Sequence, residues 1–353
     1  WKRTSAAFEQ LNTLGEVQST SAATDQRHAL LSYYGRLNYS IADRYLLTAT
    51  IRRDGSSRFA EDTRWGIFPS VALAWRISNE QWFDNLSEVM NDLKVRVSYG
   101  VTGQQDGIPN YGYIPVYTIS QPGADYMFGG QPVSTYRPEG YNPDLKWETT
   151  TSRNLGLDFG FFNNRLSGSI DYYDRKTRDL LATVPIPAGV NFDKTMLTNV
   201  GNMKSNGLEI VLNVTPVETP DWNWSLSANA TYQNNSITNL KLVEGAQSPN
   251  TLVGPTVGKG GQQVQVFTEG YAPYSFYLYK QIYDEATGRP IEGLYADLNG
   301  DGVINTSDLY HYHAVSPDWM FGLSTTLRWK KLYLSTSLRA NVGNYLYNGV
   351  AMD

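Results

Sequence analysis

The sequence predicts an all-β chain that forms a portion of a large antiparallel β-barrel in a membrane. Apolar and polar residues alternate with period two in ten separate stretches, which is the pattern of β-strands with one apolar face. Short and long connections alternate between these stretches, as they do in outer-membrane barrels. Aromatic residues stand at both ends of the apolar faces, like the aromatic girdles of such barrels.

Composition narrows the classes of function. The 353 residues include 34 Asp and Glu against 29 Lys and Arg, and this acidic balance argues against a nucleic-acid-binding protein. The chain has no cysteine, which excludes disulfides, thiol catalysis and cysteine-ligated metal sites. No apolar run approaches the ~18 residues of a transmembrane helix, but a barrel needs none. Residue 1 is Trp and no signal peptide follows, so we expect a processed or partial product.

Ten strands are expected in chain order. In the first, Tyr33 and Leu37 fall on one face, whereas Ser32 and Asn38 fall on the other. The same alternation predicts strands over 29–42, 45–52, 70–77, 93–100, 154–161, 166–172, 208–214, 224–232, 319–329 and 332–338. One amphipathic helix is expected over 79–90.

The connections divide into two sets. The short or moderate connections cover 42–44, 79–92, 162–165, 216–222 and 330–331. The long ones cover 53–66, 102–147, 177–205 and 235–317. This order predicts short periplasmic turns and long extracellular loops. We therefore expect a barrel segment over 29–353, preceded over 1–28 by the remnant of an extracellular loop or strand.

The spacing of two tryptophans favours a membrane over a soluble sandwich, which would show the same alternation. Trp319 and Trp329 share the apolar face of one strand and lie ten residues apart. At ~3.3 Å per residue and a tilt of ~40°, they span roughly 25 Å, the height of a barrel's apolar band. The polar positions are mostly small and hydroxylated, which suits a lumen.

Several strings are more specific than any periodicity. They are RLNYSIADRYLLTATIRRDGSSRFAEDTRWGIFPSVALAWRISNE, LKVRVSYGVTGQQ, NPDLKWETTTSRNLGLDFGFFNNRLSGSIDYYDRKTRDLL, VPIPAGVNF, NVGNMKSNGLEIVLNVTP and YADLNGDGVINTSD. In this order they closely resemble the C-terminal barrel region of the SusC/RagA-type TonB-dependent transporters of the Bacteroidetes outer membrane. The resemblance covers residues 29 to 350.

The resemblance implies a parent barrel of about 22 strands of the plugged-lumen type. It also implies a plug, a TonB box that couples to TonB–ExbB–ExbD, and a SusD-like surface lipoprotein that closes over the barrel. The chain shows neither plug nor TonB box and has too few strands, so we expect it to be an internal piece of a longer protein. The implied function is energy-coupled import of an oligomeric nutrient across the outer membrane. A glycan is the favoured substrate, a peptide the second choice, and no enzymatic chemistry is implied.

One local motif predicts a cation site. The run from Asp297 to Asp308 fits the twelve-residue calcium loop, with Gly302 at the sharp turn and Asp in place of Glu at the last position. The expected ligands of Ca²⁺ or Mg²⁺ are Asp297, Asn299, Asp301, the Val303 carbonyl, Asn305 and Asp308. The alternative is a plain turn whose glycines adopt positive φ.

Tyrosines gather in two of the long loops. Five of them are expected to face substrate or partner: Tyr111, Tyr113, Tyr126, Tyr274 and Tyr277. Their rings could stack on sugars, but packing between loops or against the lipoprotein explains them equally well. The competing hypothesis for the whole chain is a non-transporting surface module, a glycan-binding or adhesin β-domain that carries a calcium loop.

Overall fold

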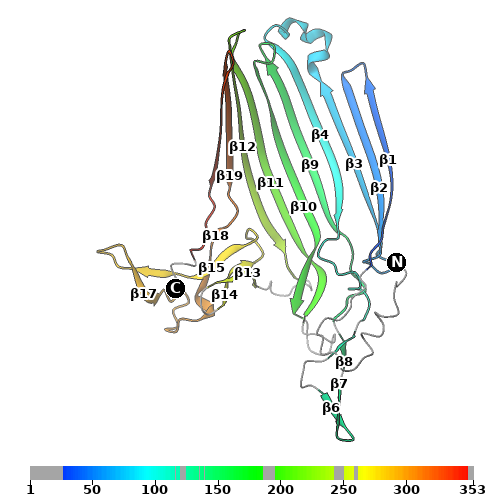
Figure 1. Ribbon diagram of the computed structural model, residues 1–353, viewed down its shortest axis with the longest axis vertical. Coiled ribbons are helices and arrows are strands. Elements are labelled where there is room, and N and C mark those ends of the chain that lie inside the picture. The colour runs from blue at the N-terminus through cyan, green and yellow to red at the C-terminus, as the bar shows by residue number, and fades with distance from the viewer. Residues whose placement is uncertain are drawn as a thin grey trace.

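A single antiparallel sheet of ten strands dominates the computed structural model (Figure 1). The structure describes residues 27–115, 117–119, 125–134, 136–138, 140–185, 195–241, 250–257 and 261–348. In sheet order, the strands are β1 (Leu30–Ile41), β2 (Tyr45–Ser56), β3 (Trp65–Arg76), β4 (Met90–Gln104), β9 (Glu148–Phe161), β10 (Leu166–Pro185), β11 (Thr195–Glu218), β12 (Trp222–Asn239), β19 (Trp319–Trp329) and β20 (Leu332–Val342). Each strand pairs with the one before it, so the wall rises and falls as the alternation predicts.

The alternation places one continuous apolar face across the wall. Along one row of paired positions, Leu37 faces Ala49, Leu73 faces Val97 and Leu323 faces Leu338. Leu73, Val97 and Leu338 are 56%, 51% and 61% exposed, and no second sheet covers them in the described part of the chain. A soluble sandwich would bury this face against another sheet, so the single layer supports the barrel and argues against the sandwich.

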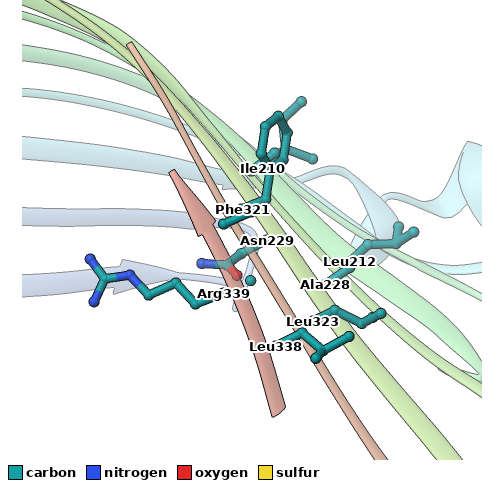
Figure 2. A pocket seen from close by; sticks show the side chains of 11 residues that line it. Ile210, Leu212, Ala228, Asn229, Phe321, Leu323, Leu338 and Arg339 are labelled. Carbon is teal, nitrogen blue, oxygen red and sulfur yellow. The ribbon is translucent and has the colours of Figure 1, made fainter. Parts of the chain in front are cut away.

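The opposite face of the wall is polar. Figure 2 shows the division near the C-terminal strands, where Asn229 and Arg339 point away from the side on which Leu212, Leu323 and Leu338 lie. Elsewhere on the polar face, hydroxyl side chains pair across strands, as in the Ser324–Ser337 contact of 3.1 Å. Because the side-chain period of a strand is two, a register slip of one residue would exchange the two faces.

Aromatic pairs mark both ends of the apolar band. Trp65 and Trp75 of β3 are ten residues apart, as are Trp319 and Trp329 of β19. Four cross-strand pairs have ring centroids 5.0 to 6.3 Å apart: Tyr45 with Trp75 and Trp222 with Trp329 at the short-turn end, and Tyr33 with Trp65 and Tyr232 with Trp319 at the long-loop end. The girdle therefore repeats at both sides of the wall, beyond the single strand on which it was predicted.

The helix expected over 79–90 is wrong. The segment forms two short 3₁₀ helices, η1 (Ile77–Asn79) and η2 (Gln81–Leu86), with an extended Glu80 between them. The Glu80 carboxylate accepts hydrogen bonds from the Tyr45 hydroxyl at 2.8 Å and the Trp75 indole at 3.0 Å. These bonds, the indole's first, lower the pKa of Glu80 and hold its backbone out of a helix. No described helix is long and apolar enough to cross a membrane.

The loop expected over 177–205 is mostly paired strand. β10 continues to Pro185 and β11 starts at Thr195, so only the centre of this region lies outside the ladder. The ladder shifts register between Thr177 and Leu181, and Asp179 there adopts a φ of +59°. The bulge breaks the period-two pattern, which explains why the alternation ended the strand too early. Residues 1–26 lie outside the described chain, so the remnant expected over 1–28 is almost wholly untested.

Charged side chains are paired on the polar face of the central strands. Arg96 on β4 lies 2.7 Å from Asp158 on β9 and 2.9 Å from Asp171 on β10. Lys94 completes the cluster at 2.7 Å from Asp158. Gly156 lies beneath it, where a Cβ would meet the Asp171 carboxylate and the Arg96 guanidinium. The missing side chain therefore makes room for a charge bridge that spans three strands.

We predict that Gly156→Ala destabilises the wall by about 1–3 kcal/mol, because the added methyl group displaces the Arg96–Asp171 pair in a packed position. Urea unfolding of the detergent-solubilised protein, followed by tryptophan fluorescence, measures the change. Gly35→Ala is the matched control, since the nearest atom to its Cβ, on Ile51, is 4.0 Å away. Equal stability of the two variants would contradict the prediction.

Candidate functional site

A small hydrophobic core lies at the long-loop end of the wall. It contains Phe59, Phe68, Ile108, Leu145 and Trp147, all buried. The Trp147 ring packs 5.0 Å from Phe59 and 5.4 Å from Phe68, the latter edge to face. The five residues come from three segments far apart in the sequence, so this core fixes the loops relative to the strands.

The strands separate to admit this core. β3 pairs with β4 only from Ser70 to Arg76, although both strands continue toward the long loops with their other neighbours. The Phe68 ring occupies the opening, in the space that a Cβ on Gly66 or Gly103 would fill. Both glycines are therefore required by the close approach of an aromatic ring and not by a turn.

The segment 142–147 ties the rim together through polar contacts. Toward the β2–β3 loop, the Thr63 hydroxyl donates to the Leu145 carbonyl at 2.7 Å. The Trp147 indole N–H donates to the Arg64 carbonyl at 3.0 Å. One residue type thus contributes both packing and a hydrogen bond at the same junction.

The same segment is bonded to β10 and β11 on its other side. The Asn199 amide accepts from the Lys146 N–H at 2.9 Å and donates to the carbonyls of Lys146 and Asp179, at 2.9 and 2.8 Å. The Lys146 ammonium lies 2.9 Å from the Asp179 carboxylate. Asn142 donates to the Leu197 carbonyl at 3.1 Å. The rim is therefore one connected unit in which 142–147 is the link.

The segment expected as a loop over 235–317 carries structure of its own. β13 (Thr251–Val257), β14 (Gln262–Phe267), β15 (Ser275–Tyr279) and β18 (Leu309–Ala314) form a four-stranded sheet, and β16 (Gln281–Tyr283) pairs with β17 (Pro290–Tyr295) (Figure 1). Backbone bonds of 2.8 and 2.9 Å join Ile237 at the end of β12 to Gly270 and Tyr271. The small sheet is thereby held against the end of the wall.

The loop over 102–147 also contains short strands. β5 (Tyr117–Ile119) pairs with β8 (Tyr136–Pro138), and β6 (Asp125–Phe128) pairs with β7 (Gln131–Ser134). Figure 1 shows these pairs extending beyond the wall at the long-loop end. On β6, Tyr126 is 64% exposed and Phe128 is 73% exposed.

The five tyrosines expected to face substrate or partner lie on three separate segments. Tyr111 and Tyr113 belong to the turn at 110–114, whose Gly112 carbonyl accepts a bond from the Asn142 N–H at 3.0 Å. The Tyr111 hydroxyl accepts the N–H of Arg27 at 3.2 Å. These two residues therefore lie beside the rim core, and Tyr126 lies on the projecting hairpin.

The remaining two tyrosines lie at the small sheet and differ in accessibility. Tyr277 on β15 is half-buried, and its hydroxyl accepts a bond from the Asn250 amide at 3.2 Å. Tyr274 is exposed, with its ring 4.8 Å from Phe267. The packing explanation therefore fits Tyr277 better, whereas Tyr126 and Tyr274 remain open to a ligand.

His311 on β18 is packed between aromatic rings. Its imidazole stacks on Tyr271 at 3.8 Å and lies 4.8 Å from Tyr277. Burial lowers the pKa of His311, so the ring is neutral at physiological pH. In this arrangement it is a packing element of the small sheet.

The expected cation loop is closed by its own backbone. The buried Asp308 carboxylate accepts the N–H groups of Leu298 and Asn305 at 2.8 and 2.9 Å, and these bonds lower its pKa. Asp297 accepts the N–H groups of Gly300 and Gly302, each at 2.7 Å. The side chains of Asn299, Asp301 and Asn305 also accept bonds from within the loop.

Both interpretations of this loop are compatible with its geometry. Gly300 and Gly302 adopt φ values of +75° and +80°, as a plain turn requires. Among the described residues no group of three or more His, Cys, Asp or Glu side chains converges to hold a metal ion. Asn and backbone carbonyl ligands lie outside that criterion, so the cation site over 297–308 stays a prediction.

Comparison with known proteins identifies the family. A model of the TonB-dependent receptor-like β-barrel matches residues 1–351. The chain belongs to the TonB-dependent receptor β-barrel family. It is 45% identical over 332 residues to the TonB-dependent receptor SusC of Bacteroides thetaiotaomicron, covering 94% of this chain and 32% of SusC. It is 35% identical to the TonB-dependent receptor P26 of Formosa agariphila, covering 90% of this chain and 32% of P26.

A solved structure agrees with this assignment. The RagAB peptide transporter matches with a TM-score of 0.72 and 30% identity, over 90% of this chain and 34% of the other. The chain thus spans about a third of the length of these relatives. As a TonB-dependent receptor barrel it is a bacterial outer-membrane protein and not an enzyme. Its long-loop end, with the rim core and the small sheet, is therefore extracellular.

The rim contacts were missed by reasoning from the sequence, which treated NPDLKWE only as a marker of resemblance. A usable signal was present: Pro143 and the flanking Asn142 and Asp144 predict a fixed turn, and Trp147 directly follows it. The partners of that turn, Arg64 and Asn199, are 83 and 53 residues from the side chains or backbone that they bind. No local pattern could have indicated them.

We predict that Trp147→Phe loosens the rim without unfolding the wall. The ring packing is kept, but the hydrogen bond to the Arg64 carbonyl is lost, at a cost of about 0.5–1.5 kcal/mol. Hydrogen exchange measured by mass spectrometry should accelerate in 57–64 and 142–147 and stay unchanged in β19 and β20. Trp82→Phe is the control, because Trp82 is 59% exposed in the short connection. Faster exchange throughout the sheet would contradict a local role.

We predict that the 297–308 loop opens in acid. The folded pKa of Asp308 is below its unfolded value of about 3.9, so its stabilisation is present above pH ~4 and is lost as the pH falls through the folded pKa. Proteolysis by pepsin, active at both pH values, should cut this loop at pH 2 but not at pH 5. In Asp308→Asn the loop should be cut at both. Resistance of the loop at pH 2 would contradict this account.

Proposed function

We propose that this chain is part of the barrel of an energy-coupled importer that brings an oligomeric nutrient across the outer membrane. The observation that carries the proposal is the asymmetry of the wall. One face is apolar and bracketed by aromatic pairs, the other is polar, and the built structure beyond the band is concentrated at the extracellular end. A wall of this kind can line a path for a polar ligand while its outer face contacts outer-membrane lipid.

The proposal includes two protein partners. A SusD-like surface lipoprotein would close over the extracellular end, and TonB–ExbB–ExbD would act from the periplasmic side through parts of the parent protein beyond this chain. The RagAB peptide importer, which matches this chain with a TM-score of 0.73 in its open-open state, has also been solved in a closed-closed state. Opening and closing at the extracellular end is thus the motion that the proposal requires.

A glycan is the proposed substrate, with a peptide as the second candidate. Aromatic rings stack on sugar faces, and the exposed Tyr126 and Tyr274 offer such rings at the extracellular end. The 45% identity to SusC is higher than the 30% identity to RagAB, which is named as a peptide transporter. The proposal extends to a Ca²⁺ or Mg²⁺ ion in the 297–308 loop, which would stiffen the surface next to β18.

The test is uptake by cells that lack the gene carrying this region. Growth on the cognate oligosaccharide as sole carbon source should be lost and restored by the intact gene, while growth on the monosaccharide is unchanged. A strain without TonB should show the same defect. Loss of growth on oligopeptides alone would exchange the two substrate candidates, and normal growth of the deletion strain on both classes would contradict import.

The cation proposal has its own measurement. Terbium, a luminescent substitute for Ca²⁺, should bind the purified protein and be sensitised by tyrosines such as Tyr295, two residues before the loop. Asp297→Asn together with Asp301→Asn should abolish the signal, because both changes remove ligand charge. Asp284→Asn is the control, since Asp284 closes a separate turn at 284–289. A signal that survives the double change would contradict the site.

A further inference from the structure

Two arginines at the extracellular rim have buried guanidinium atoms without a partner. The Nε atoms of Arg58 and Arg64 are buried, and neither makes a hydrogen bond within the described part of the chain. Neither guanidinium lies within 4.0 Å of a carboxylate of the described residues. A buried cation without a counter-charge is costly, so these two positions call for an explanation.

The loop geometry brings the two arginines to one place. Both are anchored on Ser56 at the neck of the β2–β3 loop: the Ser56 N–H donates to the Arg64 carbonyl at 3.2 Å, and the Arg58 N–H donates to the Ser56 hydroxyl at 3.2 Å. The rim core then fixes the loop, because Phe59 is fully buried and Trp147 holds the Arg64 carbonyl. The two backbones are therefore rigidly placed.

The chain's own acidic groups do not neutralise the pair. Asp54, the nearest acidic residue before the loop, is held at 2.7 Å by Arg52. Glu61 and Asp62 lie at the exposed tip of the loop, and Asp106 is exposed after β4. Arg58 uses one terminal nitrogen on the Gln105 carbonyl at 3.2 Å, and the oxygen of the Gln105 side-chain amide is buried without a partner. Rotation of that amide would present its NH₂ group instead.

We propose that Arg58 and Arg64 form a subsite for an anionic group of the transported ligand, a carboxylate or a sulfate. Guanidinium groups match such anions with paired N–H donors. The anion supplies the acceptor that the buried nitrogens lack, and the Gln105 amide can add a third donor. The subsite lies beside the aromatic rim core, so a ligand with an acidic group and an apolar face fits it. This inference rests on the import function proposed above and narrows its substrate to acidic oligomers.

The test uses matched pairs of small probes on the full-length protein in detergent. Saturation-transfer NMR compares galacturonate with galactose, and N-acetylglutamate with N-acetylglutamine. We expect the charged member of at least one pair to bind about tenfold more tightly, the scale of a hydrogen bond to a charged group. Preference for galacturonate alone identifies an acidic sugar as the source of the anion, and preference for N-acetylglutamate alone identifies an acidic peptide. Equal binding within both pairs would overturn the proposal.

Variants separate this subsite from general charge. Arg58→Gln with Arg64→Gln should remove the preference for the charged probe. Arg53→Gln should keep it, because the Arg53 guanidinium lies over the Trp65 ring at 4.5 Å and is engaged there. Heat-shifted gel mobility checks that each variant is folded, and Arg64→Lys, which keeps the charge, should retain part of the preference. A preference that survives the double change would overturn the subsite.

The outcomes for the subsite and for import are distinguishable. If the deletion strain loses uptake but the double variant binds acidic probes normally, import stands and the subsite fails. If acidic probes bind through Arg58 and Arg64 but the deletion strain takes up every oligomer tested, the subsite stands and import fails.

Discussion

The requirement that every backbone polar group be paired while one face of the sheet meets lipid governs this structure. In a bilayer an unpaired N–H or C=O costs several kcal/mol, so spanning strands must bond to both neighbours. The ten-stranded ladder meets this requirement along its interior, and the alternation of side chains then follows from the pleat. The aromatic pairs and the polar inner face are consequences of that ladder and of its two surroundings.

Departures from the ladder mark the places where the chain does something other than span. β3 and β4 part beyond Ser70 to admit Phe68 and the rim core. β10 bulges near Asp179, where Asn199 and Lys146 take the bonds that the ladder gives up. Both departures lie at the extracellular end, where water is available and loops can be built. The rim is therefore stabilised by side-chain packing and side-chain hydrogen bonds, unlike the band below it.

The rim also connects the fold to the proposed function. Segment 142–147 holds the β2–β3 loop in a fixed shape, and that loop carries the two arginines whose charges are uncompensated. A rigid support keeps the entropic cost of binding low, because little of the site has to be ordered when a ligand arrives. The exposed hairpin of β6 and β7 and the small sheet around β18 are attached to this rigid rim, where a lid or a ligand would reach them first.

The sequence by itself determined the ten strands, their order, the two faces and the family, because period-two alternation and short turns are local properties. It also indicated the girdle through Trp319 and Trp329. It did not determine the bulge near Asp179, the 3₁₀ segments around Glu80, or the small sheet within 235–317, since each depends on bonds to distant residues such as Asn199, Tyr45 and Ile237. Tertiary structure alone decided that Trp147 holds Arg64 and that Arg58 lacks a counter-charge, because burial and partnership arise only when separate loops pack together.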